Sequence, residues 1–330
     1  MSAFLRKAYP FIFLFIIIAI IAIWNGESLH PLVAFLSAIP WFLWSFLFII
    51  IALIYGFVLK ENVFFIIIIA VVFSLPFLIR DTTADNTVSF APYKVCSLNT
   101  RYFFEYLLDK PSSEQSVQLA LTKLKSDQCK VYLLQEIWLG NKRKDEITNF
   151  FKGAFPEYEF RMEGEFIILS LFPIRQTQLD SPEGYFRADI EMPLNKTVSF
   201  YNVHEWNPLF ARRCESFQGT QYKNDCPISA FNLRNDQREN LLASLKVNPN
   251  PVLIAGDFNS MEQSKVIRDL SDKLTPVLGS SFGSEATFPS IFPLIAIDHI
   301  FVSPSIEHTE KTIVCRNDLS DHCMVQTFIN

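Results

Sequence analysis

The distribution of charge along the chain constrains the fold more than any other feature of the sequence. Residues 1–80 contain only four basic and two acidic side chains, and they include three uncharged runs, at residues 8–24, 31–59 and 62–79. Each run approaches or exceeds the roughly 18–20 residues that span a bilayer. We therefore expect an anchor of about three transmembrane helices. The alternatives are a cleaved signal peptide for the first run, although no A-x-A site follows it, and one re-entrant hairpin for the other two.

Positive charges that flank the runs orient the chain in the membrane. Arg6 and Lys7 hold the N-terminus in the cytoplasm, whereas residues 25–30 carry no Lys or Arg and lie outside. Lys60 returns the chain to the cytoplasmic side. Three spans then place everything from residue 81 on the periplasmic or extracellular side of an inner or plasma membrane. A count of two spans would reverse this orientation.

Beyond the expected anchor, residues 81–92 are polar and predict a linker, and residues 93–330 predict one globular domain. All but four of the 29 basic and all but two of the 34 acidic residues lie after residue 80, so this part has a net charge of −7. That balance argues against a broad basic surface for nucleic acid.

The six cysteines show neither CxxC nor Cys/His metal spacing. An exported domain can form disulfides, and Cys214 and Cys226 are the expected pair because they lie in one polar loop. The alternative is six unrelated buried thiols, as in a cytoplasmic domain.

Short apolar runs bounded by turn residues predict buried strands. The clearest run, at residues 252–257, ends abruptly in Gly256 and Asp257, with Asn259 close behind. Further strands are expected at residues 93–99, 131–134, 166–171, 187–192, 197–203, 295–302 and 323–329, and helices at residues 112–124 and 233–245. Because strands and helices alternate irregularly and include a hairpin, the pattern predicts an α/β sandwich with mixed sheets.

Polar side chains end one expected strand after another. They are Asn99, Glu136, His204, Asp257, Asn259, Asp298, Asp321 and His322. Stability favours apolar residues at such places, because buried charge is costly unless it is paired. Carboxylates and carboxamides suit a hard cation such as Mg²⁺, and histidines with carboxylate partners suit acid–base work near neutral pH. Together they indicate hydrolysis of a phosphate ester.

Seven short motifs, in order along residues 92–330, resemble the endonuclease/exonuclease/phosphatase superfamily. They are Ser97-Leu98-Asn99, Gln135-Glu136-x-Trp138, Leu169-Ser170-Leu171-Phe172-Pro173-Ile174, Asn202-Val203-His204, Gly256-Asp257-Phe258-Asn259-Ser260, Ile297-Asp298-His299-Ile300 and Ser320-Asp321-His322. The resemblance implies a four-layer α/β sandwich, in which two mixed sheets are flanked by helices.

The resemblance also implies roles for the metal and for the general base. Glu136 binds Mg²⁺, or Mn²⁺ as the alternative, helped by Asn99 and Asp321. His322 is the general base on the attacking water, and Asp298 holds its imidazole.

The remaining implied roles concern the phosphoryl group. His204 donates a hydrogen bond or a proton to the phosphate or the leaving group. Asp257 and Asn259 position and stabilise the phosphoryl group, and Asn202 supports these residues from behind.

Residues 205–231 form a long loop that has no counterpart in this resemblance. Arg212 and Arg213 in this loop could bind a phosphate or an anionic head group, or could simply be solvated charge. Three phenylalanines, Phe282, Phe288 and Phe292, are expected to pack in the core, with contact to lipid as the alternative.

These observations predict a membrane-anchored, Mg²⁺-dependent phosphodiesterase that acts outside the cytoplasm. Its substrate is a lipid head group or nucleic acid, and its other partner is the bilayer itself; no protein partner is predicted. A nuclease proper is the alternative within this class. A catalytically silent, membrane-tethered binding or scaffold module is the alternative from another class.

Overall fold

The computed structural model describes residues 50, 92–101, 113–137, 144–180, 184–207, 226–279 and 285–330, with the backbone alone for 113, 114 and 226–230. The expected anchor and linker therefore lie outside the described residues, apart from Ile50 and Pro92. None of the described helices combines the length and the apolar character needed to cross a membrane.

The chain divides into two compact units, of which the larger comprises residues 81–206, 236–260 and 269–330. The larger unit contains both β-sheets. The described part of the smaller unit contributes the first turns of α8 (Cys226–Val247) and the beginning of α9 (Lys265–Ser271).

Six strands form the first sheet, in the order β11-β12-β1-β2-β4-β3. Their bounds are β1 Tyr93–Asn99, β2 Val131–Gln135, β3 Glu159–Glu163, β4 Phe166–Ser170, β11 Thr312–Cys315 and β12 Cys323–Ile329. Strands β1 and β2 run parallel, and the other neighbouring pairs are antiparallel.

The second sheet also has six strands, in the order β5-β6-β7-β8-β10-β9. Their bounds are β5 Ile174–Leu179, β6 Tyr185–Met192, β7 Lys196–His204, β8 Val252–Asp257, β9 Thr275–Pro276 and β10 Asp298–Val302. Here β7 and β8 are the parallel pair. A short 3₁₀ turn, Pro193–Asn195, joins β6 to β7.

Two hydrophobic cores lie on opposite faces of the first sheet. On β2, Val131 and Leu133 point into the core between the sheets, whereas Tyr132 and Leu134 point into the core beneath the helices. This alternation follows from the pleat of a strand. Because both faces are buried, β2 reads in the sequence as a continuous apolar run.

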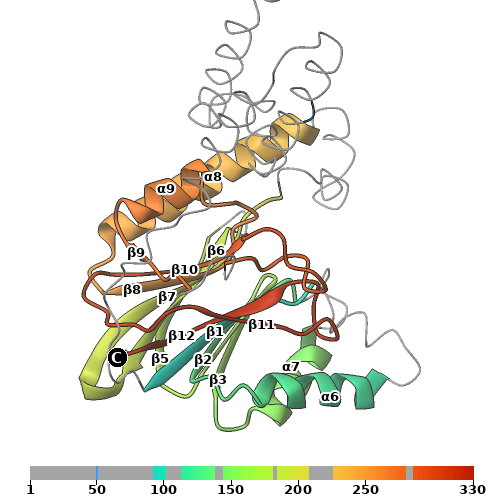
Figure 1. Ribbon diagram of the computed structural model, residues 1–330. Helices are drawn as coiled ribbons and strands as arrows, with labels where there is room; N and C mark the ends of the chain where they lie inside the picture. The colour runs from blue at the N-terminus through green and yellow to red at the C-terminus, as the bar shows by residue number, and fades with distance from the viewer. Residues whose placement is uncertain are drawn as a thin grey trace, which may run out of the picture. The chain divides into compact units, whose positions relative to one another are not determined.

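Helices flank both sheets (Figure 1). The first sheet is covered by α6 (Ser113–Lys125) and α7 (Lys144–Ala154). Residues 236–247 of α8 lie along the second sheet, where the Tyr201 hydroxyl on β7 is 3.0 Å from the Ser244 hydroxyl. The prediction of two mixed sheets flanked by helices is confirmed.

The strand directions bring the polar strand ends to one edge. In the parallel pairs, Asn99 lies beside Gln135, and His204 lies beside Asp257. The antiparallel strand β10 begins at the same edge, with Asp298 opposite Asp257. Strand β12 likewise begins there, directly after His322.

Two disulfides cross-link segments of the larger unit. Cys96 on β1 bonds Cys129, and Cys315 on β11 bonds Cys323, its register partner on β12. The alternative of unpaired thiols is therefore wrong for these four cysteines. The expected partner Cys214 lies outside the described residues, as does the side chain of Cys226.

Candidate active site

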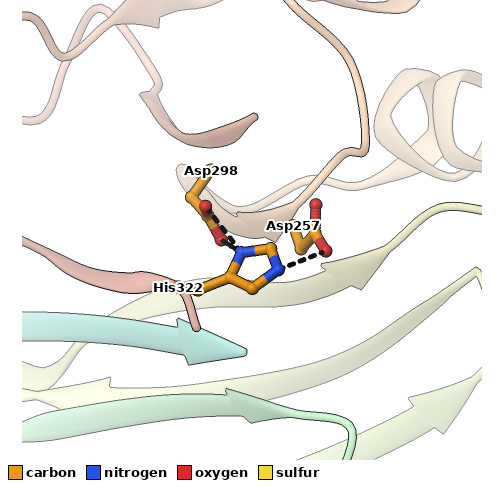
Figure 2. A group of neighbouring side chains, drawn as sticks. All are labelled: Asp257, Asp298 and His322. Carbon is orange, nitrogen blue, oxygen red and sulfur yellow. Dashed lines mark hydrogen bonds and ion pairs between the residues drawn. The ribbon is translucent and has the colours of Figure 1, made fainter. Parts of the chain in front are cut away.

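All eight residues predicted for the catalytic and metal sites, and the supporting residue Asn202, lie at or beside the edge where these strand ends meet. At its centre the imidazole of His322 lies between two carboxylates (Figure 2). His322 Nδ1 is 3.0 Å from Oδ2 of Asp298, and His322 Nε2 is 3.8 Å from Oδ2 of Asp257. The ring also contacts Phe288, with ring centroids 4.9 Å apart, so its orientation is fixed on several sides.

Neighbouring charges affect the pKa of the His322 imidazole more than its burial does. Burial alone would lower the pKa of His322, but the carboxylates of Asp298 and Asp257 outweigh that effect and raise it to about 10. For Asp257, burial raises the pKa to about 6, although the charge of His322 opposes the rise. These two carboxylates therefore hold a proton on His322 at neutral pH.

A second imidazole, that of His204, is held between two glutamates. Its Nδ1 lies 2.6 Å from Oε1 of Glu165, and its Nε2 lies 3.1 Å from Oε1 of Glu136. Burial opposes the charged form, but Glu165 and Glu136 prevail and raise the pKa of His204 well above its usual value. His204 is thus a buried imidazolium at neutral pH and can donate from Nε2.

Glu165 was not predicted from the sequence. It follows Gly164 in the tight turn between β3 and β4, and its buried side chain reaches the end of β7. A single glutamate in a hairpin turn ordinarily indicates a solvated loop. Only the packing of the two sheets brings it to His204.

The third group at this edge consists of carboxamides around Asp257. Asn99 Nδ2 donates to Asp257 Oδ2 at 2.9 Å, and Asn259 Nδ2 donates to the same oxygen at 3.2 Å. Asn259 has φ 46° and Glu136 has φ 50°, a region that non-glycine residues rarely adopt. Such backbone conformations concentrate where side chains must be aimed at a ligand.

Asn202 joins the two sheets behind this group. From β7, its Nδ2 donates to the carbonyls of Leu134 and Ile167 in the first sheet, at 2.9 and 3.0 Å. Its Oδ1 accepts a hydrogen bond from Gln135. These hydrogen bonds fix β7 against the first sheet close to His204, and the supporting role of Asn202 in catalysis stays a prediction.

Gly256 is required by the close approach of β8 to β7. It has φ 154°, and a Cβ atom there would lie 1.9 Å from the carbonyl oxygen of Val203. Only glycine fits such a position. Gly256 therefore sets Asp257 beside His204.

Oxygen donors that suit a divalent cation lie at the same edge. Burial opposes ionisation of Glu136, but His204 and Asn99 outweigh it and lower its pKa. Asp321 Oδ2 pairs with Arg101 Nη1 at 2.8 Å, whereas its buried Oδ1 has no hydrogen-bond partner among the described residues. A hard cation prefers such carboxylate and carbonyl oxygens, so Glu136, Asn99 and Asp321 fit one.

A second grouping also offers metal ligands. Asp257, Asp298 and His322 each present one ligand atom, all within 4.8 Å of one another. Nδ1 of His322 already contacts Asp298, so this group offers acid–base partners as well as metal ligands. Trp138, Arg212 and Arg213 lie outside the described residues.

Comparison with known proteins identifies relatives of this fold. The sequence model described as the Endonuclease/Exonuclease/phosphatase family matches residues 96–322. An endonuclease/exonuclease/phosphatase structure from Bacteroides vulgatus is 15% identical, with a TM-score of 0.50, over 72% of this chain and 98% of its own. Two further structures have TM-scores of 0.51 and 16% identity over 72% of this chain. They are D. rerio TDP2 humanized by 14 mutations, covered over 98% of its length, and a functionally unknown conserved protein from Enterococcus faecalis, covered over 99%.

At these identities the structural similarity shows the fold alone. A comparison with curated proteins found no significant match.

Proposed function

Because the chain belongs to the endonuclease/exonuclease/phosphatase family, whose members are generally phosphoester hydrolases, we propose that it is a membrane-anchored, Mg²⁺-dependent phosphodiesterase. Its catalytic domain acts on the periplasmic or extracellular side. The preferred substrate class is a lipid head group, with nucleic acid as the alternative.

One observation carries the proposal of phosphodiester hydrolysis. Nε2 of His204 and Nε2 of His322 lie on either side of one atom, Oδ2 of Asp257, at 3.9 and 3.8 Å, and Nε2 of His204 also lies 3.1 Å from Oε1 of Glu136. Each imidazole has its own carboxylate partner on the far nitrogen, Glu165 or Asp298. Two oriented imidazoles that face one point can act on the two ends of one reacting group, the attacking water and the leaving oxygen.

The mechanism follows from these positions. His322 acts as the base in its neutral form: once Nε2 has released its proton to solvent, it takes the proton of the attacking water, while Asp298 keeps the ring oriented through Nδ1. His204, held protonated by Glu165, donates from Nε2 to the phosphoryl group or the leaving oxygen. The amides of Asn99 and Asn259 are placed to donate to phosphoryl oxygens as negative charge develops there.

Glu136, Asn99 and Asp321 would hold a divalent cation, whose positive charge would stabilise the phosphate and lower the proton affinity of His322. Enzymes of this family usually use divalent metal ions, and Mg²⁺ is our choice because the donors are oxygens.

The disulfides support the proposed location. Cys96–Cys129 and Cys315–Cys323 are bonds of the kind that persist in oxidising compartments and are rare in the cytosol. This agrees with the orientation that the charges around the uncharged runs predict.

The acidic character of the part after residue 80 favours a lipid head group over nucleic acid. A nuclease would need a basic track along which a strand could bind, and a silent scaffold would not need two oriented imidazoles. The experiment described next distinguishes a nuclease and a silent scaffold from a lipid phosphodiesterase.

The test compares substrates with the full chain in detergent micelles. Sphingomyelin, glycerophospholipids, plasmid DNA and RNA are each offered with Mg²⁺ or with EDTA, to the wild type and to Glu136→Ala. We expect Mg²⁺-dependent release of a lipid head group that Glu136→Ala lacks. Cleavage of DNA or RNA instead would make the protein a nuclease, and turnover of no substrate by the folded wild type would favour the scaffold.

A further inference from the structure

A short hairpin beside the candidate active site exposes large apolar side chains. Residues 286–297 contain no charged residue, and Phe288 bridges Ile295 at the base of the hairpin. At its tip, Ile291 is 78%, Phe292 69% and Leu294 53% exposed. The expectation that Phe292 packs in the core is therefore wrong, because the hairpin turns this side chain outward. Phe288, by contrast, packs against His322.

The hairpin is ordered by its own backbone. Phe292 N donates to the carbonyl of Pro289 at 3.0 Å, and Leu294 N donates to the carbonyl of Phe288 at 2.9 Å. The apolar tip is thus a turn with its own backbone hydrogen bonds. Clusters of exposed apolar side chains on soluble surfaces mark sites of contact with a partner or a membrane.

The same hairpin is fastened to the catalytic segment. Ser290 donates from its backbone N to the carbonyl of Asp321 at 2.6 Å, and from its hydroxyl to the carbonyl of Ser320 at 2.7 Å. Cys323 N donates to the carbonyl of Thr287 at 2.8 Å. Whatever the tip contacts is therefore held close to Asp321 and His322.

The sequence indicates which surface is available to the tip. The uncharged runs predict a bilayer anchor that ends at residue 80, and only the twelve residues 81–92 separate this anchor from β1. A fully extended segment of that length reaches at most ~40 Å. The domain is therefore expected to work within that distance of a lipid surface, and an uncharged tip suits the acyl–headgroup boundary.

We propose that Ile291, Phe292 and Leu294 insert into the surface of a phospholipid bilayer and bring the head groups of bilayer lipids to the site at His322. This inference rests on the proposed function and narrows its substrate class to lipids presented in a membrane. In this proposal, contact between the hairpin and the bilayer makes the enzyme prefer a lipid in a membrane to a soluble ester.

The test measures insertion directly, without relying on activity. The full chain is reconstituted into vesicles of ordinary or brominated phosphatidylcholine, because bromine quenches tryptophan that reaches the acyl chains. Phe292→Trp and Ile291→Trp place the probe on the tip, and the wild-type chain measures the background of the native tryptophans.

Leu194→Trp is the matched control. Leu194 is also exposed, at 88%, but it precedes the start of β7, and His204 is the last residue of that strand. These nine residues separate the control from the site by ~30 Å.

We expect the fluorescence added by either tip tryptophan to fall about twofold or more in brominated vesicles, and that of the control to change little. Equal fluorescence of the tip variants in both kinds of vesicle would overturn the inference, as would equal quenching of tip and control. Hydrolysis of soluble bis(4-nitrophenyl) phosphate by the same samples tests the proposed function separately. Quenching without hydrolysis would reject the phosphodiesterase and keep the membrane contact.

Discussion

The Nδ1 atom of His204 lies 2.6 Å from Oε1 of Glu165, and both side chains are buried. The carboxylate raises the pKa of this imidazole, so its removal should make His204 lose its proton at lower pH. We predict that Glu165→Gln lowers kcat about 10–100-fold and shifts the alkaline limb of the pH–kcat profile to lower pH.

The matched control is Glu163→Gln, the same change on an exposed residue of the same hairpin. It should leave both kcat and the pH profile unchanged. An unshifted profile in Glu165→Gln would mean that the pair does not control the proton of His204.

Gly256 gives a prediction about stability. A methyl group at Gly256 would collide with the backbone of Val203, whereas one at Gly153 on α7 would meet nothing within 4 Å. We expect Gly256→Ala to cost on the order of 2–4 kcal/mol of unfolding free energy and Gly153→Ala to be neutral or mildly stabilising. Thermal unfolding of the two variants measures the difference, and equal midpoints would contradict the account.

Much of the site could be predicted because its residues stand at the ends of strongly apolar strands. Residues 252–257 were expected as a buried strand, and β8 spans Val252–Asp257. The direction of a strand and the type of residue at its end are local properties, so Asn99 and His204 were also found at strand ends. Their convergence follows from the parallel pairing of β1 with β2 and of β7 with β8.

What could not be predicted depends on contacts between distant segments. The strand β5 carries mostly exposed polar residues, so it has no apolar pattern. Glu165 acquires its role only when the sheets stack, and the partner of Cys96 is set by the position of the turn after α6. The exposed tip at Phe292 reads in the sequence like core, because an apolar run does not reveal which way it faces.

The buried imidazole of His299 predicts how stability depends on pH. Its Nε2 lies 2.7 Å from the carbonyl oxygen of Ser260, and burial, with Lys311 adding to it, lowers the pKa of His299 to about 4. In the unfolded chain the pKa is about 6.5. The contribution of neutral His299 to the free energy of unfolding is therefore fully present above pH ~6.5. About 3 kcal/mol of it is lost as the pH falls from there through 4.

We therefore expect the unfolding midpoint of the wild type to fall more steeply than that of His299→Gln between about pH 6.5 and 4. The glutamine cannot take up the proton, so the two curves should converge on acidification. Curves that stay parallel over this range would show that His299 is not the responsible group.

The two disulfides should have different effects on activity. Cys315–Cys323 closes the loop that carries Asp321 and His322, whereas Cys96–Cys129 ties β1 to the turn after α6. Replacing either pair by serine should cost about 2–4 kcal/mol of stability. We expect kcat per folded molecule to fall several-fold only without Cys315–Cys323, since the ordering of that loop depends on this bond. Equal kcat in both double variants would contradict this prediction.

We propose that His322 acts together with a divalent cation to hydrolyse a phosphodiester. The most direct measurement is the turnover of bis(4-nitrophenyl) phosphate by the full chain with Mg²⁺ or EDTA, for the wild type, His322→Ala and His308→Ala. His308 is a buried histidine whose Nδ1 contacts the backbone of Ile306, so it controls for loss of an imidazole elsewhere. We predict Mg²⁺-dependent turnover that falls about 100-fold or more in His322→Ala and persists in His308→Ala. No turnover by the folded wild type, or turnover that survives both EDTA and the loss of His322, would contradict it.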